Sequence, residues 1–205
     1  MVFSKEIRDY LKTMGIDPKA YEQSLIKEFS DKAHWFQEII ASFNDVPEKE
    51  MSIDSFNEFY ASTGNPPTGS FYNKIYDLFN YLKLFKDGGK FNLYKNRQAE
   101  WDGPKVRLDK SDVPSSDIHL LSGKELIYRG MSENEFNSGT FGQSWTTDIS
   151  TAKCFAQETY LDEPPGIIAT TKINIPDVIH YAKDDSEHEV IVVDGSIVSA
   201  NKFNG

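Results

Sequence analysis

The chain has 205 residues, a formal net charge of -10 at pH 7 and a pI near 4.9. Thirty-two Asp and Glu against 22 Lys and Arg argue against a protein that binds nucleic acid through the phosphate backbone. The single cysteine excludes an internal disulfide framework, and no apolar run approaches the length of a membrane span. Because the first residues are charged where a signal peptide would be apolar, we expect a soluble cytoplasmic protein.

The first half of the chain has the periodicity of helices. Apolar spacing and turn residues predict three helices, over residues 4–14, 17–43 and 69–85. Ser4 and Asp17 are the expected N-caps of the first two, and Pro18 fits the first helical position. Gly15 is the expected stop of the first helix, and the glycines within 87–89 end the third.

Short strand-like runs replace helices after about residue 115. Runs rich in β-branched and aromatic residues predict strands within residues 124–130, 166–175, 177–182, 188–195 and 196–203. One helix is predicted among them, over 149–161. Helices followed by strands predict an α+β fold with a mainly antiparallel sheet. We expect a helical N-terminal region, residues 1–115, packed on a core formed by residues 116–205.

Two polar segments stand at the ends of predicted elements in this second half. Arg129 closes a strand run and precedes Gly130, which lets a ligand approach the backbone closely. Ser144 and Thr146 come directly before the predicted helix. Taken singly, these patterns are also typical of a surface arginine and of an edge strand that leads into a helix cap.

A third segment places two carboxylates around a histidine at the start of an apolar strand. In an extended strand Glu187 and Glu189 would share one face while His188 would point to the other, which argues against a metal site built from the three. Alone, the pattern is also typical of a solvated strand end. Cys154 has no recognisable base as a nucleophile, and its context predicts the buried face of a helix.

In chain order, the three segments resemble a known pattern of an arginine, a Ser-x-Thr and a Glu-x-Glu. The segments "LIYRGMS", "SWTTDISTAKCFA" and "EHEVIVVDGS" are similar to the R-S-E class of mono-ADP-ribosyltransferases. Within that class, the small arginine-modifying enzymes of T-even-like bacteriophages share this length and a helical first half. The resemblance covers residues 126–196 and implies a split, mainly antiparallel catalytic sheet that binds NAD as co-substrate and needs no metal.

The resemblance also implies which residues bind NAD. Arg129 would contact a phosphate or the nicotinamide ribose, and Gly130 would present main-chain groups to the nicotinamide amide. Ser144 would orient the catalytic glutamate, and Thr146 takes the place of the final serine of the motif. Phe155 matches an aromatic residue that packs on the nicotinamide ring.

The catalytic residues implied by the resemblance are Glu189, Glu187 and Arg129. Loss of nicotinamide leaves a cationic, oxocarbenium-like ribose, which a carboxylate such as Glu189 stabilises, as carboxylates do in glycosidases. An acceptor arginine is always charged and presents a planar fork of donors, which Glu187 would hold.

These implications favour transfer of ADP-ribose from NAD to arginine side chains of a host bacterial protein, such as one of the transcription or translation machinery. The alternatives are an NAD glycohydrolase, a transferase to another acceptor, including one that uses NAD-capped RNA as donor, and a silent binding module. A structural protein without activity also stays open. No membrane partner is expected, and no nucleic acid partner is expected except NAD-capped RNA.

Overall fold

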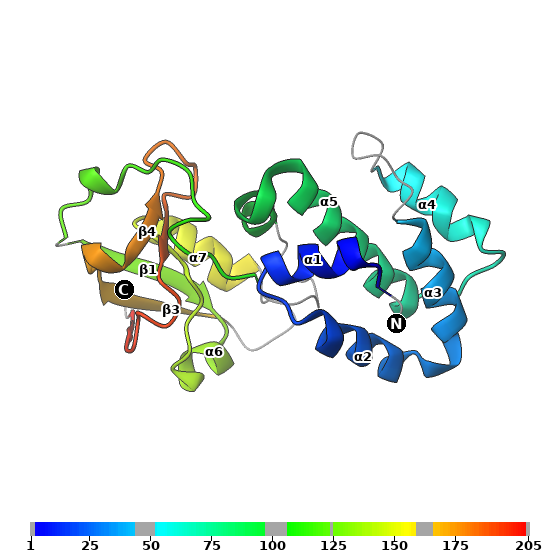
Figure 1. Ribbon diagram of the computed structural model, residues 1–205. Helices are drawn as coiled ribbons and strands as arrows, with labels where there is room; N and C mark the ends of the chain where they lie inside the picture. The colour runs from blue at the N-terminus through cyan, green and yellow to red at the C-terminus, as the bar shows by residue number, and fades with distance from the viewer. Residues whose placement is uncertain (1–2, 44–51, 97–105, 124, 159–165, 204–205) are drawn as a thin grey trace. The chain divides into compact units, whose positions relative to one another are not determined.

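The computed structural model describes residues 3–43, 52–96, 106–123, 125–158 and 166–203. The chain divides into two compact units, Met1–Arg107 and Leu108–Gly205, and each is described by itself. In Figure 1 the helices of the first unit run from blue to green and the sheet of the second from green to red. Each unit has its own apolar core. Among the described residues, no helix combines the length and the apolar character required to cross a membrane.

The first unit is helical, as the sequence predicted. Its α-helices are α1 (Lys5–Thr13), α2 (Pro18–Glu28), α3 (Ala33–Ser42), α4 (Ile53–Ser62) and α5 (Ser70–Asn96). The predicted caps are confirmed: the Ser4 side chain accepts a hydrogen bond from Ile7 N, and the Asp17 side chain accepts one from Lys19 N. These caps satisfy backbone donors that the first turn of a helix leaves unpaired.

The helix predicted over residues 17–43 is divided in two. Phe29, with φ of -122° and ψ of 42°, leaves the helical conformation after α2, and a 3₁₀ turn over Ser30–Lys32 leads into α3. The break turns the Phe29 ring onto Phe71 at the start of α5, where the two centroids lie 5.2 Å apart at 88°. Tertiary packing of an aromatic pair thus overrides a helical periodicity that continues through the break.

The third predicted helix, over residues 69–85, extends further in the structure than the sequence predicted. Helical geometry stops at Gly88 and Gly89, the latter with φ of 73°, as the sequence predicted, but a further helical segment continues to Asn96. The side chain of Asn92 donates a hydrogen bond back to Leu84 O over 3.0 Å. This bond satisfies a carbonyl that the interrupted helix leaves open, so the two segments join across a kink.

The second unit is built around one antiparallel sheet. Its strands are β1 (Leu126–Met131), β2 (Ser144–Thr146), β3 (Ile167–Lys172), β4 (Val178–Tyr181), β5 (Glu189–Val192) and β6 (Asn201–Lys202), in the order β4-β5-β2-β1-β3-β6. Neighbouring strands β1 and β2 share a single register pair, the fewest of any neighbours. The short helix α6 (Glu133–Ser138) follows β1, and α7 (Ile149–Glu158) packs on β1, β2 and β3. The α+β class is therefore confirmed.

The boundary between the units lies earlier than residue 115. The buried side chain of Gln143 accepts a hydrogen bond from Leu108 N and donates one to Leu108 O, both over 2.8 Å, and it also donates to Val192 O. Val106, by contrast, belongs to the helical core. Because both backbone groups of Leu108 pair with an amide of the sheet unit, the chain joins that unit at Leu108, and sequence composition gave no sign of this contact.

Candidate active site

Three neighbouring strands carry the residues that the sequence singled out. β2 lies between the other two, so that Thr146 is opposite both Glu189 of β5 and Tyr128 of β1. Ser144 begins β2, and Arg129 follows Tyr128 in β1. The strand order thus brings together segments that are far apart in the chain. It also makes β2 an inner strand, so the alternative interpretation of this segment as an edge strand is wrong.

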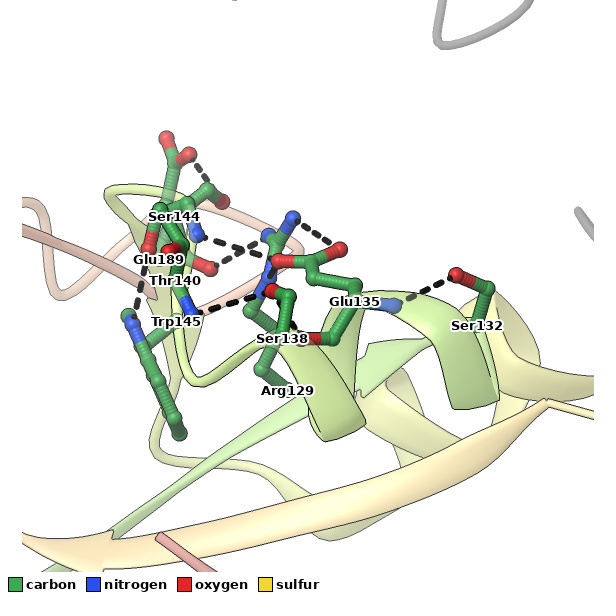
Figure 2. Close-up of polar contacts among 9 residues, drawn as sticks. Arg129, Ser132, Glu135, Ser138, Thr140, Ser144, Trp145 and Glu189 are labelled. Atoms are coloured by element: carbon green, nitrogen blue, oxygen red, sulfur yellow. Dashed lines mark hydrogen bonds and ion pairs between the residues drawn. The ribbon is translucent and has the colours of Figure 1, made fainter. Parts of the chain in front are cut away.

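A serine hydroxyl orients the buried carboxylate of this site. Ser144 Oγ donates a hydrogen bond to Glu189 Oε1 over 2.6 Å, the short distance typical of a bond to an ionised acceptor. Glu189 is only 6% exposed, although it begins its strand. Figure 2 shows the carboxylate beside Ser144. A buried carboxylate with one oxygen fixed is a positioned negative charge, suited to stabilise a cation that develops next to it.

Arg129 connects the helix after β1 to the strand that carries Ser144. Its Nε and Nη2 donate to the two carboxylate oxygens of Glu135, over 2.9 and 3.2 Å, and its Nη1 donates to Ser144 O over 2.8 Å (Figure 2). The resemblance predicts a contact with a phosphate or ribose of NAD for Arg129. In this structure the guanidinium binds a carboxylate in the two-bond geometry that is specific to arginine, and it also binds the β2 backbone.

The hydroxyl of Thr146 forms hydrogen bonds with backbone groups of two neighbouring segments. Thr146 Oγ1 donates to Glu187 O over 2.7 Å and accepts from Asp148 N over 2.9 Å, and Thr146 is buried. The side chain predicted to bind the cofactor therefore links the turn before β5 to the start of α7. The Thr146 hydroxyl thus holds the turn before β5 and the start of α7 in place relative to each other.

The sequence predicted that Glu187 and Glu189 share one face of a strand, and this prediction is wrong. β5 begins only at Glu189, and the preceding residue, His188, has a φ of 47° in the left-handed region. Backbone hydrogen bonds hold this turn, from His188 N to Asp185 O and from Thr147 N to His188 O. Glu187 is exposed in the turn, whereas Glu189 is buried. The alternation argument fails here because it applies only to consecutive extended residues.

Asp148 is the N-cap of α7, the helix that the sequence predicted over residues 149–161. Its carboxylate accepts hydrogen bonds from Ser150 N and Thr151 N, both over 3.1 Å, and from the Thr151 hydroxyl. The bond from Ser150 N, then that from the Thr151 hydroxyl, lower the pKa of Asp148, and His188 lowers it slightly. Since the pKa is lowered on folding, the stability from this cap is present at neutral pH and is lost as the pH falls through the folded-state pKa.

Gly130 lies where α7 crosses β1. A Cβ added at this residue would lie 2.3 Å from Ala152 O, 2.5 Å from Ala156 N and 2.8 Å from Phe155 Cβ. The glycine therefore allows the helix backbone to approach the strand, in addition to any contact with a ligand. Phe155, which the resemblance assigns to the nicotinamide ring, starts beside this crossing and is 42% exposed.

We expect Gly130→Ala to destabilise the protein by about 1 to 3 kcal/mol, because the methyl group would overlap with backbone atoms of α7 that cannot rotate away. Urea unfolding measures the change. Ser150→Ala is the matched control, since Ser150 is exposed on the same helix, and it should leave the free energy of unfolding within about 0.5 kcal/mol. A Gly130→Ala protein as stable as the native one would contradict the close packing described.

Cys154 is exposed on α7, so the prediction that it lies on the buried face of the helix is wrong. The buried positions are Ala152 and Ala156, whose small side chains suit the close approach of helix and sheet. Among the described residues no group of three or more His, Cys, Asp or Glu side chains has an arrangement that could hold a metal ion.

Two residues of the site were missed by the sequence analysis. Glu135 holds Arg129, and Gln143, next to Ser144, connects β2 to both Leu108 and β5. The sequence contains a signal for Glu135. Ser132 and Glu135 have the spacing of a capping box, which predicts a helix after the first strand. No sequence signal marks Gln143, because its partners are backbone groups of distant segments.

Comparisons with models of protein families, with curated proteins and with solved structures find no match, so the functional assignment depends on the geometry of this site.

Proposed function

We propose that this chain is an NAD-dependent mono-ADP-ribosyltransferase that modifies arginine side chains of a target protein and releases nicotinamide. The observation that carries the proposal is the hydrogen bond from Ser144 Oγ to Glu189 Oε1, on a strand whose backbone is also held by Arg129. Three residues of the R-S-E pattern thus contact one another in series. We assign the split expected in an ADP-ribosyltransferase sheet to the junction between β1 and β2, which share a single register pair within one continuous sheet.

The proposed reaction needs a fixed negative charge and no general acid. The bond between the nicotinamide nitrogen and ribose C1′ breaks with its electron pair on nicotinamide, which leaves as a neutral molecule. Glu189 stabilises the cationic ribose that remains. A guanidinium nitrogen of the acceptor then bonds to C1′ and gives up one proton to solvent water. We assign the holding of this guanidinium to Glu187, which is exposed to solvent.

The charge distribution supports a cationic acceptor. Residues 108–205 contain seven Lys and Arg against sixteen Asp and Glu, a formal charge of -9 out of the chain's -10. A field of this sign attracts arginine-bearing surfaces and repels phosphate backbones. The target that we propose is a basic protein surface, as on proteins of the transcription or translation machinery.

Mass spectrometry of a bacterial lysate incubated with NAD tests the proposal. With the native protein we expect a mass increase of one ADP-ribose on arginine residues, and we expect none with a Glu189→Ala variant. If nicotinamide is released without any modified protein, the chain is an NAD glycohydrolase or lacks its acceptor in that lysate. If neither product forms, a silent binding module replaces the proposed transferase.

A further inference from the structure

Glu135 departs from the usual role of a glutamate in the first turn of a helix. Ser132 caps α6, and its hydroxyl accepts a hydrogen bond from Glu135 N over 3.1 Å. In a capping box the glutamate side chain would return to the backbone N–H of the cap. Here the carboxylate of Glu135 instead binds Arg129, so that the short helix presents an acid to the motif arginine.

The same carboxylate also holds the segment that leads to Ser144. Glu135 Oε1 accepts a second hydrogen bond, from Gly142 N over 3.0 Å. A Cβ added at Gly142 would lie 2.7 Å from Arg129 Nη2, so the guanidinium lies directly against this backbone. The indole of Trp145 donates to Gly142 O over 3.0 Å. The backbone around Gly142 is thus fixed by Glu135, by Arg129 and by Trp145.

These contacts form one connected series, drawn in Figure 2. Glu135 binds Arg129, Arg129 Nη1 binds Ser144 O, and Ser144 Oγ binds Glu189. The side chains of Arg129 and Glu135 are 22% and 20% exposed, so solvent reaches the pair only in part. A partly buried two-bond ion pair is stronger and geometrically more specific than a pair on the open surface.

We infer that Glu135 is a positioning residue for the reaction proposed above, acting through Arg129 and the Gly142–Ser144 backbone on the orientation of Glu189. It fixes which way the Arg129 fork points and therefore where Ser144 O and Oγ lie. The catalytic carboxylate takes its orientation from that hydroxyl. This inference depends on the proposed function, because it states how the catalytic glutamate of that reaction is held.

The test compares Glu135→Gln with Glu133→Gln in an assay of nicotinamide release at varied NAD concentration. Glutamine keeps the size of residue 135 but removes the charge that holds the fork, so Glu189 loses its fixed orientation. Misplacement of a catalytic group by about 1 Å costs up to about 100-fold, and we expect kcat to fall about 10- to 100-fold. The KM for NAD should change by less than about threefold, since Glu135 acts on orientation and not on ground-state binding.

Glu133→Gln is the matched control. Glu133 is exposed in the same turn of α6 and loses the same charge, so its variant should keep the native kcat and KM. Glu135→Asp keeps the charge on a shorter side chain and should recover part of the lost kcat. A change that came from general loss of helix α6 would not be rescued in this way.

A second measurement does not depend on activity. The indole N–H resonance of Trp145 reports on its hydrogen bond to Gly142 O, within the segment that Glu135 holds. This resonance should shift in Glu135→Gln and stay unchanged in Glu133→Gln.

Two results would overturn the inference: a folded Glu135→Gln protein with native kcat, or one in which the KM for NAD falls because Arg129 is released to bind the cofactor. If the native protein releases no nicotinamide, the proposed function fails. In that case an unshifted Trp145 resonance would show that the positioning role fails as well, whereas a shifted one would retain the coupling of Glu135 to this segment.

Discussion

Replacing Glu189 by glutamine is expected to lower nicotinamide release and ADP-ribose transfer together, by about 100- to 1,000-fold in kcat. Glutamine has nearly the same shape and still presents an oxygen to the Ser144 hydroxyl, which donates to Glu189 over 2.6 Å in the native protein. The variant lacks the negative charge that we propose stabilises the cationic ribose. Steady-state release of nicotinamide measures the hydrolytic part, and incorporation of labelled ADP-ribose into an acceptor measures transfer.

Folding has to be controlled, because Glu189 is buried and is paired with Thr146 of β2. Thermal unfolding of the Glu189→Gln protein should match that of the native protein, since an uncharged amide is easier to bury than a carboxylate. Ser144→Ala should lose less activity than Glu189→Gln, because the carboxylate stays while its orientation relaxes. Full activity in a folded Glu189→Gln protein would show that another group stabilises the transition state.

Replacing Glu187 by glutamine is expected to separate the two activities. Hydrogen bonds to a charged group contribute about 1.5 to 3 kcal/mol, so loss of the bond to the acceptor guanidinium should reduce transfer by about 10- to 100-fold. Release of nicotinamide without an acceptor should stay near the native rate, because Glu187 lies in the turn before β5 and not in the strand that holds Glu189, to which we assign catalysis. Both rates are measured on the same preparation, with a soluble arginine analogue as acceptor.

Asp184→Asn is the control for charge alone. Asp184 is exposed in the same acidic segment, and its loss removes one negative charge without removing the carboxylate that we assign to the acceptor. Equal losses of transfer in Glu187→Gln and Asp184→Asn would mean that the general field of the segment, and no specific contact, recruits the acceptor. Loss of nicotinamide release in Glu187→Gln would contradict the division of roles between the two glutamates.

Several parts of the fold were predictable from sequence because their causes are local. The caps Ser4 and Asp17 bind backbone N–H groups within three residues, and the turn at Gly89 needs a positive φ that glycine adopts without cost. The strand runs of the second half were recognised by composition, since β-branched residues fit a buried pleated surface. The order of the three motif segments was likewise visible in the sequence.

Other features required the tertiary structure. The division of the helix at Phe29 depends on the packing of its ring against Phe71, a partner that periodicity does not reveal. The turn at His188 depends on hydrogen bonds from His188 N to Asp185 O and from Thr147 N, directly after β2, to His188 O. This turn removes Glu187 from the strand. In both places a contact between distant residues outweighs the local preference of the chain.

The sequence by itself determined the α+β class and most elements, because each depends on neighbours along the chain. Only the tertiary structure decided how the residues of the three motif segments are connected. Pairing of β2 with both β1 and β5 sets Ser144 against Glu189, and Glu135 meets Arg129 only because α6 turns back on its strand. Strand order and helix return are determined by burial and hydrogen bonding of the whole unit, which no local pattern contains.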